Sequence, residues 1–483
     1  MAAHINVLYL AAEAEPFVKV GGLGDVAGSL PRYLRGGLDE ASGDSRADVR
    51  LVIPRHPVLK AGGRRVRPLL DFGIRFRGGE TRVRVFSTVV DGLPVYLVDG
   101  PPISAGGSVY SADSTLDGDK YLFFSLAAVE MMRYLDWQPN VVHANDWHTS
   151  LACYALLLRR RLGEYRGVAS VLTVHNLPFM GPDISKPLDD YGIAQVETGL
   201  PDWAKPRPLP LGLWAADAIV AVSPSYAREI QTREFGCGLE RYVRARRDSL
   251  NGILNGIDYD AYDPATDPAL ASNFEIRTLQ RRALNKSALQ VRLGLAVDEQ
   301  VPLLGVVSRL DPQKGIDLLR PVMRRLREQP WQMVILGTGT AAIEQSVLSL
   351  QDDFPDRVRA EIKYDAGLAR QIYAGADLLL MPSRYEPCGL SQLIALRYGC
   401  VPIVSAVGGL RDTILADETG FLVSSPTSAR WAPAIKRALT FLGDAAHWRE
   451  LQEAGMSQDF SWRASATKYV DLYQRLLTQA ASG

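Results

Sequence analysis

The sequence lacks an excess of charge of either sign, a cysteine pattern and any long apolar run. Among its 483 residues, 54 basic side chains balance 54 acidic ones, so the formal net charge is zero. Proteins that coat nucleic acid or lie on a membrane surface usually carry a basic excess, and this balance argues against both classes. The four cysteines have no C-x-x-C spacing, which argues against a disulfide framework and against a zinc site.

No segment reads as a membrane span or a signal peptide. The apolar runs stay well short of the roughly 20 residues that cross a bilayer. The N-terminus has no basic region followed by a long apolar core, because Glu13 and Glu15 interrupt it early. These absences predict a soluble, cytoplasmic, globular protein.

Short apolar runs alternate with amphipathic stretches in both halves of the chain. This pattern is typical of a parallel sheet wrapped by helices, an α/β fold, and the chain is too long for one core. We expect two doubly wound domains, residues 1–260 and 261–460, with Asp258–Asn273 as the linker and a final helix over 461–483 that packs back across the interface. Ligands should bind at the carboxyl ends of the strands, in the cleft between the domains.

The stretch K-V-G-G-L-G-D-V, residues 19–26, lies where the first strand should turn into the first helix. Its glycines let a ligand approach the backbone, the amides at a helix start favour an anion, and Lys19 adds a positive charge. The stretch therefore predicts a phosphate or sugar site. A tight turn whose glycines serve packing alone is the alternative.

A second loop, with Gly337, Gly339 and Ala342, matches the dinucleotide-binding pattern G-x-G-x-x-A between a strand and a helix. Glu361 or Asp365 would then be the ribose-binding acid, which favours a nicotinamide-dependent oxidoreductase as a rival function. Against this rival, the loop follows the second strand of its domain, whereas the pattern normally follows the first.

A third glycine turn, at Gly408 and Gly409, follows another predicted strand. Three such turns at strand ends in two domains suit a nucleotide and a sugar that are held from both sides. They suit a single hydride cofactor less well.

Two charged segments follow predicted strands of the second half. S-R-L-D-P-Q-K-G places Arg309 and Lys314 on one loop, where two cations can neutralise a departing diphosphate without a metal ion. A solvated loop with Asp311 as a helix cap is the alternative.

Glu386 precedes Pro-Cys-Gly at an expected helix start, where the helix dipole favours the ionised carboxylate. It can accept hydrogen bonds from sugar hydroxyls, or serve only as a good helix start. We interpret Cys388 as a packed thiol or a ligand neighbour.

Histidines and acids also end strands of the first half. In V-V-H-A-N-D-W-H-T-S, residues 141–150, the histidine spacing is not a zinc pattern, whereas Asp146 and Trp147 are a suitable pair to contact a carbohydrate. His175 and Asn176 end another strand, where the histidine is either a structural hydrogen bonder or a catalytic group. We interpret Asp119, in the segment D-G-D, as the N-cap of a helix over Lys120–Leu135 rather than as a metal ligand.

The motifs in their order resemble those of bacterial glycogen synthases and plant starch synthases. The resemblance rests on K-V-G-G-L-G-D-V, H-A-N-D-W-H, T-V-H-N-L, V-S-P-S-Y-A-R-E-I, I-L-N-G-I-D, S-R-L-D-P-Q-K-G and S-R-Y-E-P-C-G-L-S-Q-L, and it runs from about Asn6 to Asp412. It implies the GT-B architecture, two Rossmann-like domains facing across a deep cleft. It also implies glucose transfer, usually from ADP-glucose, to the non-reducing 4-hydroxyl of an α-1,4-glucan with retention and without a metal or cofactor.

The resemblance implies a role for each matching position. The implied catalytic set consists of Arg309, Lys314, Glu386, His175 and Asp146. In it the two cations stabilise the leaving ADP, and Glu386 holds the glucose hydroxyls. His175 lies on the β-face of the sugar, and Asp146 lines the acceptor side. The implied substrate-binding residues are Lys19, Gly21, Gly22, Tyr110, Trp147, Asn176, Gly337, Gly339, Cys388, Gly389, Leu390, Gly408 and Gly409.

The chain departs from the family pattern at three positions and in one segment. Val20 replaces a common threonine or serine, Asn145 replaces a frequent histidine, and Ile394 occupies the place of a second glutamate that related GT-B enzymes have. The segment Asp183–Leu213, which borders the acceptor groove in the family, is divergent. Two alternatives therefore stand beside the glycogen synthase interpretation: a sibling enzyme that uses UDP-glucose or another acceptor, and a non-catalytic glucan-binding regulatory protein.

Overall fold

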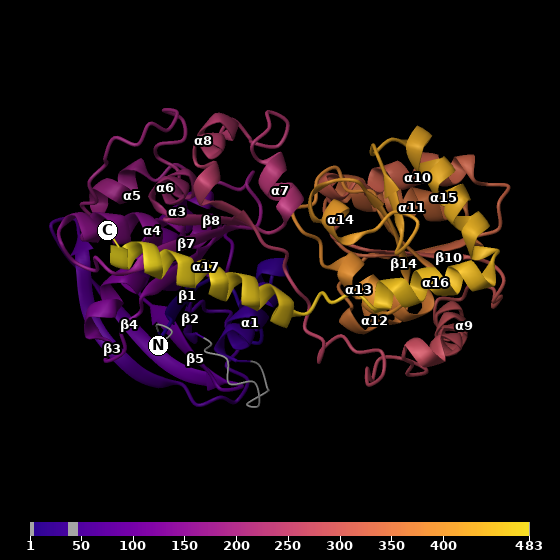
Figure 1. Ribbon diagram of the computed structural model, residues 1–483, viewed down its shortest axis with the longest axis horizontal. Helices are drawn as coiled ribbons and strands as arrows, with labels where there is room; N and C mark the ends of the chain where they lie inside the picture. Colours follow the sequence, from indigo (N-terminus) through magenta and orange to yellow (C-terminus); the bar gives the residue numbers. More distant parts are fainter. Residues whose placement is uncertain (1–3, 37–46, 483) are drawn as a thin grey trace. The chain divides into compact units, whose positions relative to one another are not determined.

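The computed structural model describes residues 4–36 and 47–482. Within them the chain forms two compact α/β units (Figure 1). The first unit runs to Gly256 and also takes in the chain from Trp462 onward, and the second runs from Ile257 to Ser461. The expected fold class, two α/β domains built on parallel sheets, is confirmed. No helix of the described residues is long and apolar enough to cross a membrane.

The described part of the first unit contains a nine-stranded sheet with the order β3-β4-β5-β2-β1-β6-β7-β8-β9. Pairing is parallel from β5 to β9, with Val7 opposite both Val49 and Val141, and antiparallel within β3-β4-β5. The strands are β1 (Asn6–Leu10), β2 (Asp48–Pro54), β3 (Arg67–Phe76), β4 (Gly79–Val90), β5 (Leu93–Asp99), β6 (Val141–Asn145), β7 (Ala169–Val174), β8 (Ala218–Ala221) and β9 (Leu250–Gly252).

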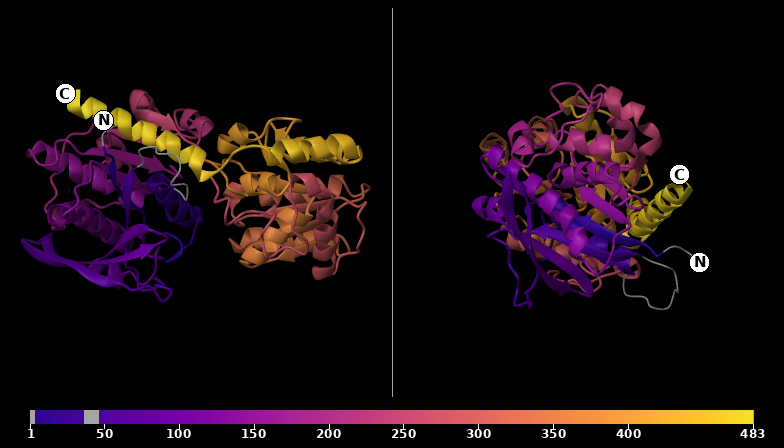
Figure 2. Two further views of the ribbon diagram at one scale, coloured as in Figure 1. Left: turned by 60° about the horizontal axis from the view of Figure 1, so that its bottom comes forward. Right: turned by 90° about the vertical axis from the view of Figure 1, so that its left-hand side faces the viewer.

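The sequence pattern does not reveal β3, which forms the sheet edge and pairs with β4 (Figure 2). Its buried residues Phe72 and Ile74 are separated by Gly73 and flanked by the charged residues Asp71 and Arg75. The strand is held by antiparallel pairing with β4. That pairing is a contact between segments, and the apolar content of the strand alone does not reveal it.

The helices of the first unit follow their strands, with one correction to a predicted cap. They are α1 (Gly22–Arg35), α2 (Pro101–Ala105), α3 (Ser114–Met131), α4 (Asp146–Arg161), α5 (Ser185–Asp190), α6 (Pro208–Ala215), α7 (Pro224–Glu229), α8 (Glu240–Ala245) and α17 (Trp462–Ser482). The N-cap of α3 is Asp113, whose carboxylate accepts the amide of Thr115 at 2.9 Å. Asp119 lies inside the helix, so its assignment as the cap was wrong.

Helix α17 completes the core of the first unit. Along β1, Val7 and Tyr9 point into the same cluster as Trp462 and Tyr473 of α17, while the alternate residues point to the other face of the sheet. The ring of His143 on β6 lies 2.6 Å from the hydroxyl of Tyr473, and both side chains are fully buried. In Figure 1 this helix runs along the unit beside α1. The last segment of the chain therefore stabilises the first domain.

The described part of the second unit contains a six-stranded parallel sheet with the order β12-β11-β10-β13-β14-β15. One side of the sheet packs against α10, α11 and α15, and the other against α9, α12 and α13. The elements are α9 (Arg282–Arg292), β10 (Leu303–Val307), α10 (Leu319–Arg325), β11 (Gln332–Leu336), α11 (Ala341–Asp353), β12 (Val358–Glu361), α12 (Ala366–Gly375), β13 (Leu378–Met381), α13 (Ser391–Arg397), β14 (Val401–Ser405), α14 (Gly408–Thr413), β15 (Phe421–Val423), α15 (Ser428–Leu442) and α16 (Ala445–Met456).

The segment Asp258–Asn273, predicted as a free linker, is instead packed onto the second unit. The buried carboxylate of Asp267 accepts a hydrogen bond from the hydroxyl of Tyr398 at 2.5 Å and pairs with Arg370 at 3.3 Å. The sequence shows the turn-forming residues of this segment, but it does not show the two distant partners of Asp267.

Buried histidines of the first unit predict acid sensitivity. Burial lowers the pKa of His143 to about 3 and the pKa of His56 to about 4, whereas a histidine in the unfolded chain has a pKa of about 6.5. The unfolded chain therefore binds more protons, and the stability that depends on the neutral rings is fully present above about pH 6.5 and is lost toward pH 4. We expect calorimetry to show a falling unfolding temperature over this range.

His143→Gln tests this prediction, because it should reduce the pH dependence of the unfolding free energy by up to about 1.4 kcal/mol per pH unit. His447→Gln, at an exposed histidine of the second unit, is the matched control. Asp146, whose pKa burial raises to about 7, acts in the opposite direction and is common to all the variants. An unchanged pH dependence in His143→Gln would contradict the prediction.

Candidate active site

Polar side chains of the first unit gather at the carboxyl ends of β1, β6 and β7, which are neighbours in the sheet. The glycine loop follows β1, Asn145 and Asp146 lie where β6 meets α4, and His175 and Asn176 follow β7. Parallel neighbouring strands end at the same edge, so these segments meet although they are far apart in the sequence. The sequence predicted each position separately, and the sheet order brings them together.

The amides of the glycine loop bind an anion that is a side chain of the protein itself. The carboxylate of Glu13 accepts the amides of Val20 and Gly21 and, at 2.9 Å, the hydroxyl of Tyr110. Burial raises the pKa of Glu13, and these hydrogen bonds oppose the rise. From the sequence, Glu13 was predicted only to break an apolar run. Its position between β1 and the glycines was the available signal.

Lys19 lies between two acids. Its ammonium is 2.6 Å from Asp25 on α1 and 3.1 Å from Glu15. Burial lowers the pKa of Lys19, but pairing with Asp25 and Glu15 outweighs burial and raises it overall. Lys19 is therefore a fixed cation at the start of α1, which begins at Gly22.

Asp146 holds the loop after β7. Its Oδ1 accepts the amides of His175 at 2.7 Å and Asn176 at 3.3 Å, and burial raises its pKa to about 7. Asp146 has φ 53°, in the left-handed region that non-glycine residues seldom adopt. Strain of this kind persists where the surrounding contacts demand it, and here it aims the carboxylate at the β7 loop.

The ring of Trp147 packs against neighbouring aromatic rings of the protein. Its ring is buried and packs 4.1 Å from the ring of His148 and 5.3 Å from the ring of Tyr121. These packed rings hold the Trp147 side chain in place, and its contact with a carbohydrate stays a prediction. Gly181 is required here, because a Cβ on it would lie 2.7 Å from the Trp147 ring.

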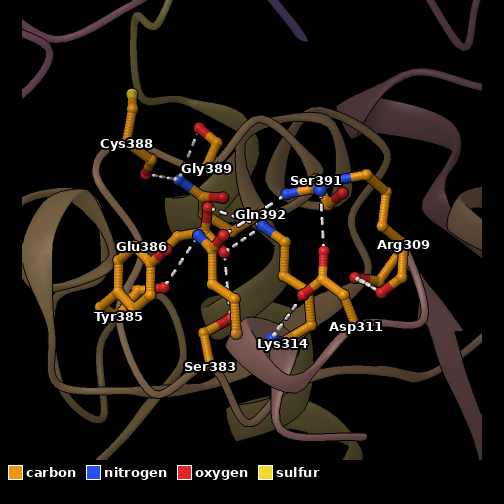
Figure 3. Close-up of polar contacts among 12 residues, drawn as sticks. Arg309, Asp311, Lys314, Ser383, Tyr385, Glu386, Cys388, Gly389, Ser391 and Gln392 are labelled. Carbon is orange, nitrogen blue, oxygen red and sulfur yellow. Dashed lines mark hydrogen bonds and ion pairs between the residues drawn. The ribbon is translucent and has the colours of Figure 1, made fainter. Parts of the chain in front are cut away.

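In the second unit, Lys314 and Glu386 form a buried ion pair (Figure 3). The ammonium of Lys314 lies 2.8 Å and 2.6 Å from the two carboxylate oxygens of Glu386, and the hydroxyl of Ser383 donates to Glu386 at 3.0 Å. Lys314 follows β10 and Glu386 follows β13, the next strand in the sheet. A cation and an anion are thus fixed against each other at one edge of the sheet.

Glu386 is not at a helix start. Helix α13 begins at Ser391, five residues later, and Gly389 between them has φ 77°. The predicted stabilisation by the helix dipole was therefore wrong, and Lys314 supplies the positive charge instead. Cys388 is buried, as the packed-thiol interpretation expected, and Leu390 is the N-cap of α13.

Arg309 is the more exposed cation of its loop. Its guanidinium pairs with Asp311 at 2.8 Å, and 56% of its side chain is exposed. The Asp311 carboxylate also accepts the backbone amide of Lys314 at 3.2 Å, so the predicted capping role of Asp311 is confirmed. The loop therefore presents one buried and one accessible cation (Figure 3).

The glycines at 337 and 339 serve backbone packing. A Cβ on Gly337 would lie 1.8 Å from the carbonyl oxygen of Ser308, and a Cβ on Gly339 would lie 1.9 Å from that of Leu310. Their amides donate to the carbonyl of Glu361 and to the carboxylate of Glu344. Neither amide is left for a phosphate, so direct contact through these amides is not supported.

The acids proposed for a ribose have other partners. The Glu361 carboxylate pairs with Lys363 at 2.8 Å, and Asp365 caps α12 by accepting the amide of Leu368. The G-x-G loop therefore lacks the free acidic side chain that a dinucleotide-binding site needs for the ribose.

The third glycine turn closes against the segment that carries Glu386. The amide of Gly409 donates to the carbonyl of Glu386 at 3.1 Å, and a Cβ on Gly409 would lie 2.3 Å from the carbonyl oxygen of Cys388. Gly408 begins α14 with φ 44°. These two glycines hold the Glu386 segment in place.

Sequence reasoning missed Tyr364. It lies just beyond the carboxyl end of β12, which pairs with β11, and 78% of it is exposed. A large exposed aromatic ring at a ligand-binding edge is a common feature of a binding surface. Its sequence signal was the single aromatic residue after a strand.

Within the described residues, no group of three or more His, Cys, Asp or Glu side chains is placed to hold a metal ion.

Comparison with known proteins identifies the family. The model of the starch synthase catalytic domain matches residues 6–245, and that of the glycosyl transferases group 1 matches residues 292–451. The chain is 39% identical to the glycogen synthase of Streptococcus gordonii over 98% of this chain and 100% of the relative. It is 40% identical to that of Lactiplantibacillus plantarum, over 98% and 99%.

A solved structure agrees over the whole chain. The catalytic domain of starch synthase IV from Arabidopsis thaliana, bound to ADP and acarbose, matches with a TM-score of 0.87 and 32% identity, over 99% of this chain and all of that one. These matches confirm the GT-B fold class and a glycosyltransferase activity, and they overturn the oxidoreductase rival. The chain belongs to the glycogen and starch synthase family of glycosyltransferases.

Proposed function

We propose that this glycosyltransferase moves glucose from ADP-glucose to the non-reducing 4-hydroxyl of an α-1,4-glucan, with retention at the anomeric carbon. The observation that carries this function is the Lys314–Glu386 ion pair at the carboxyl edge of the second sheet, with Arg309 on the same loop. Binding of a glucan alone does not require a diphosphate grip. This cluster therefore favours transfer over the regulatory alternative.

The reaction breaks the bond between the glucose anomeric carbon and the distal phosphate oxygen, and the electron pair leaves with ADP. The acceptor oxygen forms the new bond to the same carbon, and its proton passes to the departing phosphate oxygen of ADP. Lys314 and Arg309 neutralise the charge that builds on the departing phosphate. Glu386 accepts hydrogen bonds from the sugar hydroxyls and stabilises positive charge in the ring. Donor binding thus exchanges the internal Lys314–Glu386 pair for contacts to phosphate and sugar.

Residues of the first unit bind and position the glucose in this mechanism. Lys19, held at the start of α1, contacts the donor, and Glu13 keeps the glycine loop and Tyr110 in one arrangement. His175 positions the sugar ring, and Asp146 acts through the backbone of the His175 loop. Asp146 is therefore a positioning residue rather than a direct acceptor contact.

The nucleotide base is assigned to the end of β12. Tyr364 is an exposed ring just after β12, and β12 is separated by β11 from β10, the strand that leads into the loop of Arg309 and Lys314. Aromatic rings stack on bases. The related starch synthase IV structure is bound to ADP, which supports ADP-glucose as the donor.

The first test compares donors. Release of the nucleoside diphosphate is measured with glycogen as acceptor, with ADP-glucose and UDP-glucose in parallel and without added metal. We expect fast release from ADP-glucose that depends on the glycogen primer. Preference for UDP-glucose would change the donor and keep the mechanism, and silence with both donors would favour the regulatory alternative.

The second test removes each partner of the ion pair. Lys314→Ala and Glu386→Gln should each lower kcat by about a hundredfold or more, because each removes charge stabilisation of the transition state. Arg324→Ala is the matched control, since Arg324 forms an ion pair with Asp353 on the outside of the same unit. Near-normal kcat in either site variant, with unchanged circular dichroism, would refute these roles.

The third test concerns Tyr364. Tyr364→Ala should raise KM for the donor about tenfold, whereas Tyr364→Phe keeps the ring and should change KM little, because base stacking contributes about 1–3 kcal/mol. The thermal stability of both variants should match the parent chain, since the ring is exposed. Equal KM values for the two variants would remove Tyr364 from the donor site.

A further inference from the structure

The side chain of Asn145 makes three hydrogen bonds at the junction of β6 and α4. Its Oδ1 lies 3.1 Å from the hydroxyl of Tyr9 and 3.0 Å from Nε2 of His175, and its Nδ2 donates to the carbonyl of Leu10 at 2.9 Å. Its backbone amide donates to the hydroxyl of Thr149. The Asn145 and Tyr9 side chains are fully buried. Such a network holds the amide group in one orientation.

The orientation of this amide is decided by its neighbours. The carbonyl of Leu10 can only accept, so it requires the NH2 group of Asn145 on its side. A flipped amide would place two oxygens against one another at that distance. The oxygen of Asn145 therefore faces Tyr9 and His175, and Tyr9 fills one of its two acceptor positions as a donor.

An amide oxygen carries no hydrogen, so Nε2 of His175 must donate. We propose that Asn145 is a positioning residue that fixes His175 as the Nε2–H tautomer and leaves the lone pair of Nδ1 to accept a hydrogen bond from a sugar hydroxyl. Among the described residues, Nδ1 of His175 has no hydrogen-bond partner, and the side chain is half-buried at the strand edge. The inference deepens the proposed function, on which its substrate half rests.

Two adjacent residues thus control one histidine. Asn145 sets the hydrogen position on the ring, and Asp146 holds the backbone amide of the same residue. Burial also lowers the pKa of His175 to about 4, so the ring is neutral at physiological pH. A neutral ring with one defined tautomer offers one donor and one acceptor at known places, and a wrong tautomer of a site histidine is costly in catalysis.

The chemistry also explains why asparagine suits this position. An asparagine oxygen has two lone pairs and can accept from Tyr9 and His175 together. A histidine, which the family resemblance places here, offers one acceptor nitrogen and cannot accept from both. The tautomer of His175 is then open, since the partner ring can donate as well as accept.

The deciding experiment is nitrogen-15 NMR of the full chain with labelled histidine. The chain has only six histidines, and His175→Gln identifies the signals of His175. We expect a protonated-type shift at Nε2 and an unprotonated-type shift at Nδ1. The opposite pattern would overturn the proposal. Because this readout needs no substrate, it is independent of whether the proposed function is right.

Variants test the cause. Asn145→Leu removes the acceptor at similar volume, so we expect a mixture of His175 tautomers and a fall in kcat of about tenfold or more. Asn145→His should recover part of the lost kcat. Tyr9→Phe removes a hydroxyl from the same network but keeps the acceptor, so the tautomer should be unchanged. A single Nε2–H tautomer with unchanged kcat in Asn145→Leu would refute the role of Asn145. If Asn145→Leu fails to fold, the parent chain and Tyr9→Phe still decide the tautomer.

Discussion

Parallel strand pairing is the constraint on which the rest of this structure depends. In a parallel sheet all carboxyl ends lie at one edge, and each loop that follows a strand is delivered there. In the first unit the neighbours β1, β6 and β7 bring together Glu13, Asp146 and His175. In the second unit β10 and β13 bring Lys314 to Glu386, which is 72 positions away in the chain. Glycine turns make this possible because they let loop backbones pass close to one another.

Positive charges at the carboxyl edge of each sheet are neutralised by acidic side chains of the same unit. Lys19 is paired with Asp25 and Glu15, and Lys314 is paired with Glu386. A partly buried cation without a partner is costly, so the folded chain keeps the cations that we propose to bind substrate in internal pairs. A phosphorylated substrate then competes with a carboxylate for each cation. Sites arranged in this way are preorganised, because the charges stay fixed before the substrate arrives.

Local sequence determined a large part of this picture. The alternation of apolar runs and amphipathic stretches specified two α/β units, because side-chain periodicity follows directly from strand and helix geometry. Motif order specified the family and, through the resemblance, the residues that we propose for the site. Lys314, Glu386, Asp146 and His175 all follow the carboxyl ends of the predicted strands. Predictions failed where a segment depends on distant partners, as with the edge strand β3.

The tertiary structure alone decided what each side chain contacts. Glu386 needed a counter-charge, and the sequence suggested a helix dipole where the fold supplies Lys314. Trp147 was predicted to contact a carbohydrate, and the fold packs its ring against neighbouring aromatic rings. Asn145 was noted only as a departure from the family pattern, and the fold places its oxygen 3.0 Å from the His175 ring. The physical reason is common to all three. Hydrogen bonding and burial are set by neighbours in space, which strand order chooses, whereas a sequence reports only neighbours along the chain.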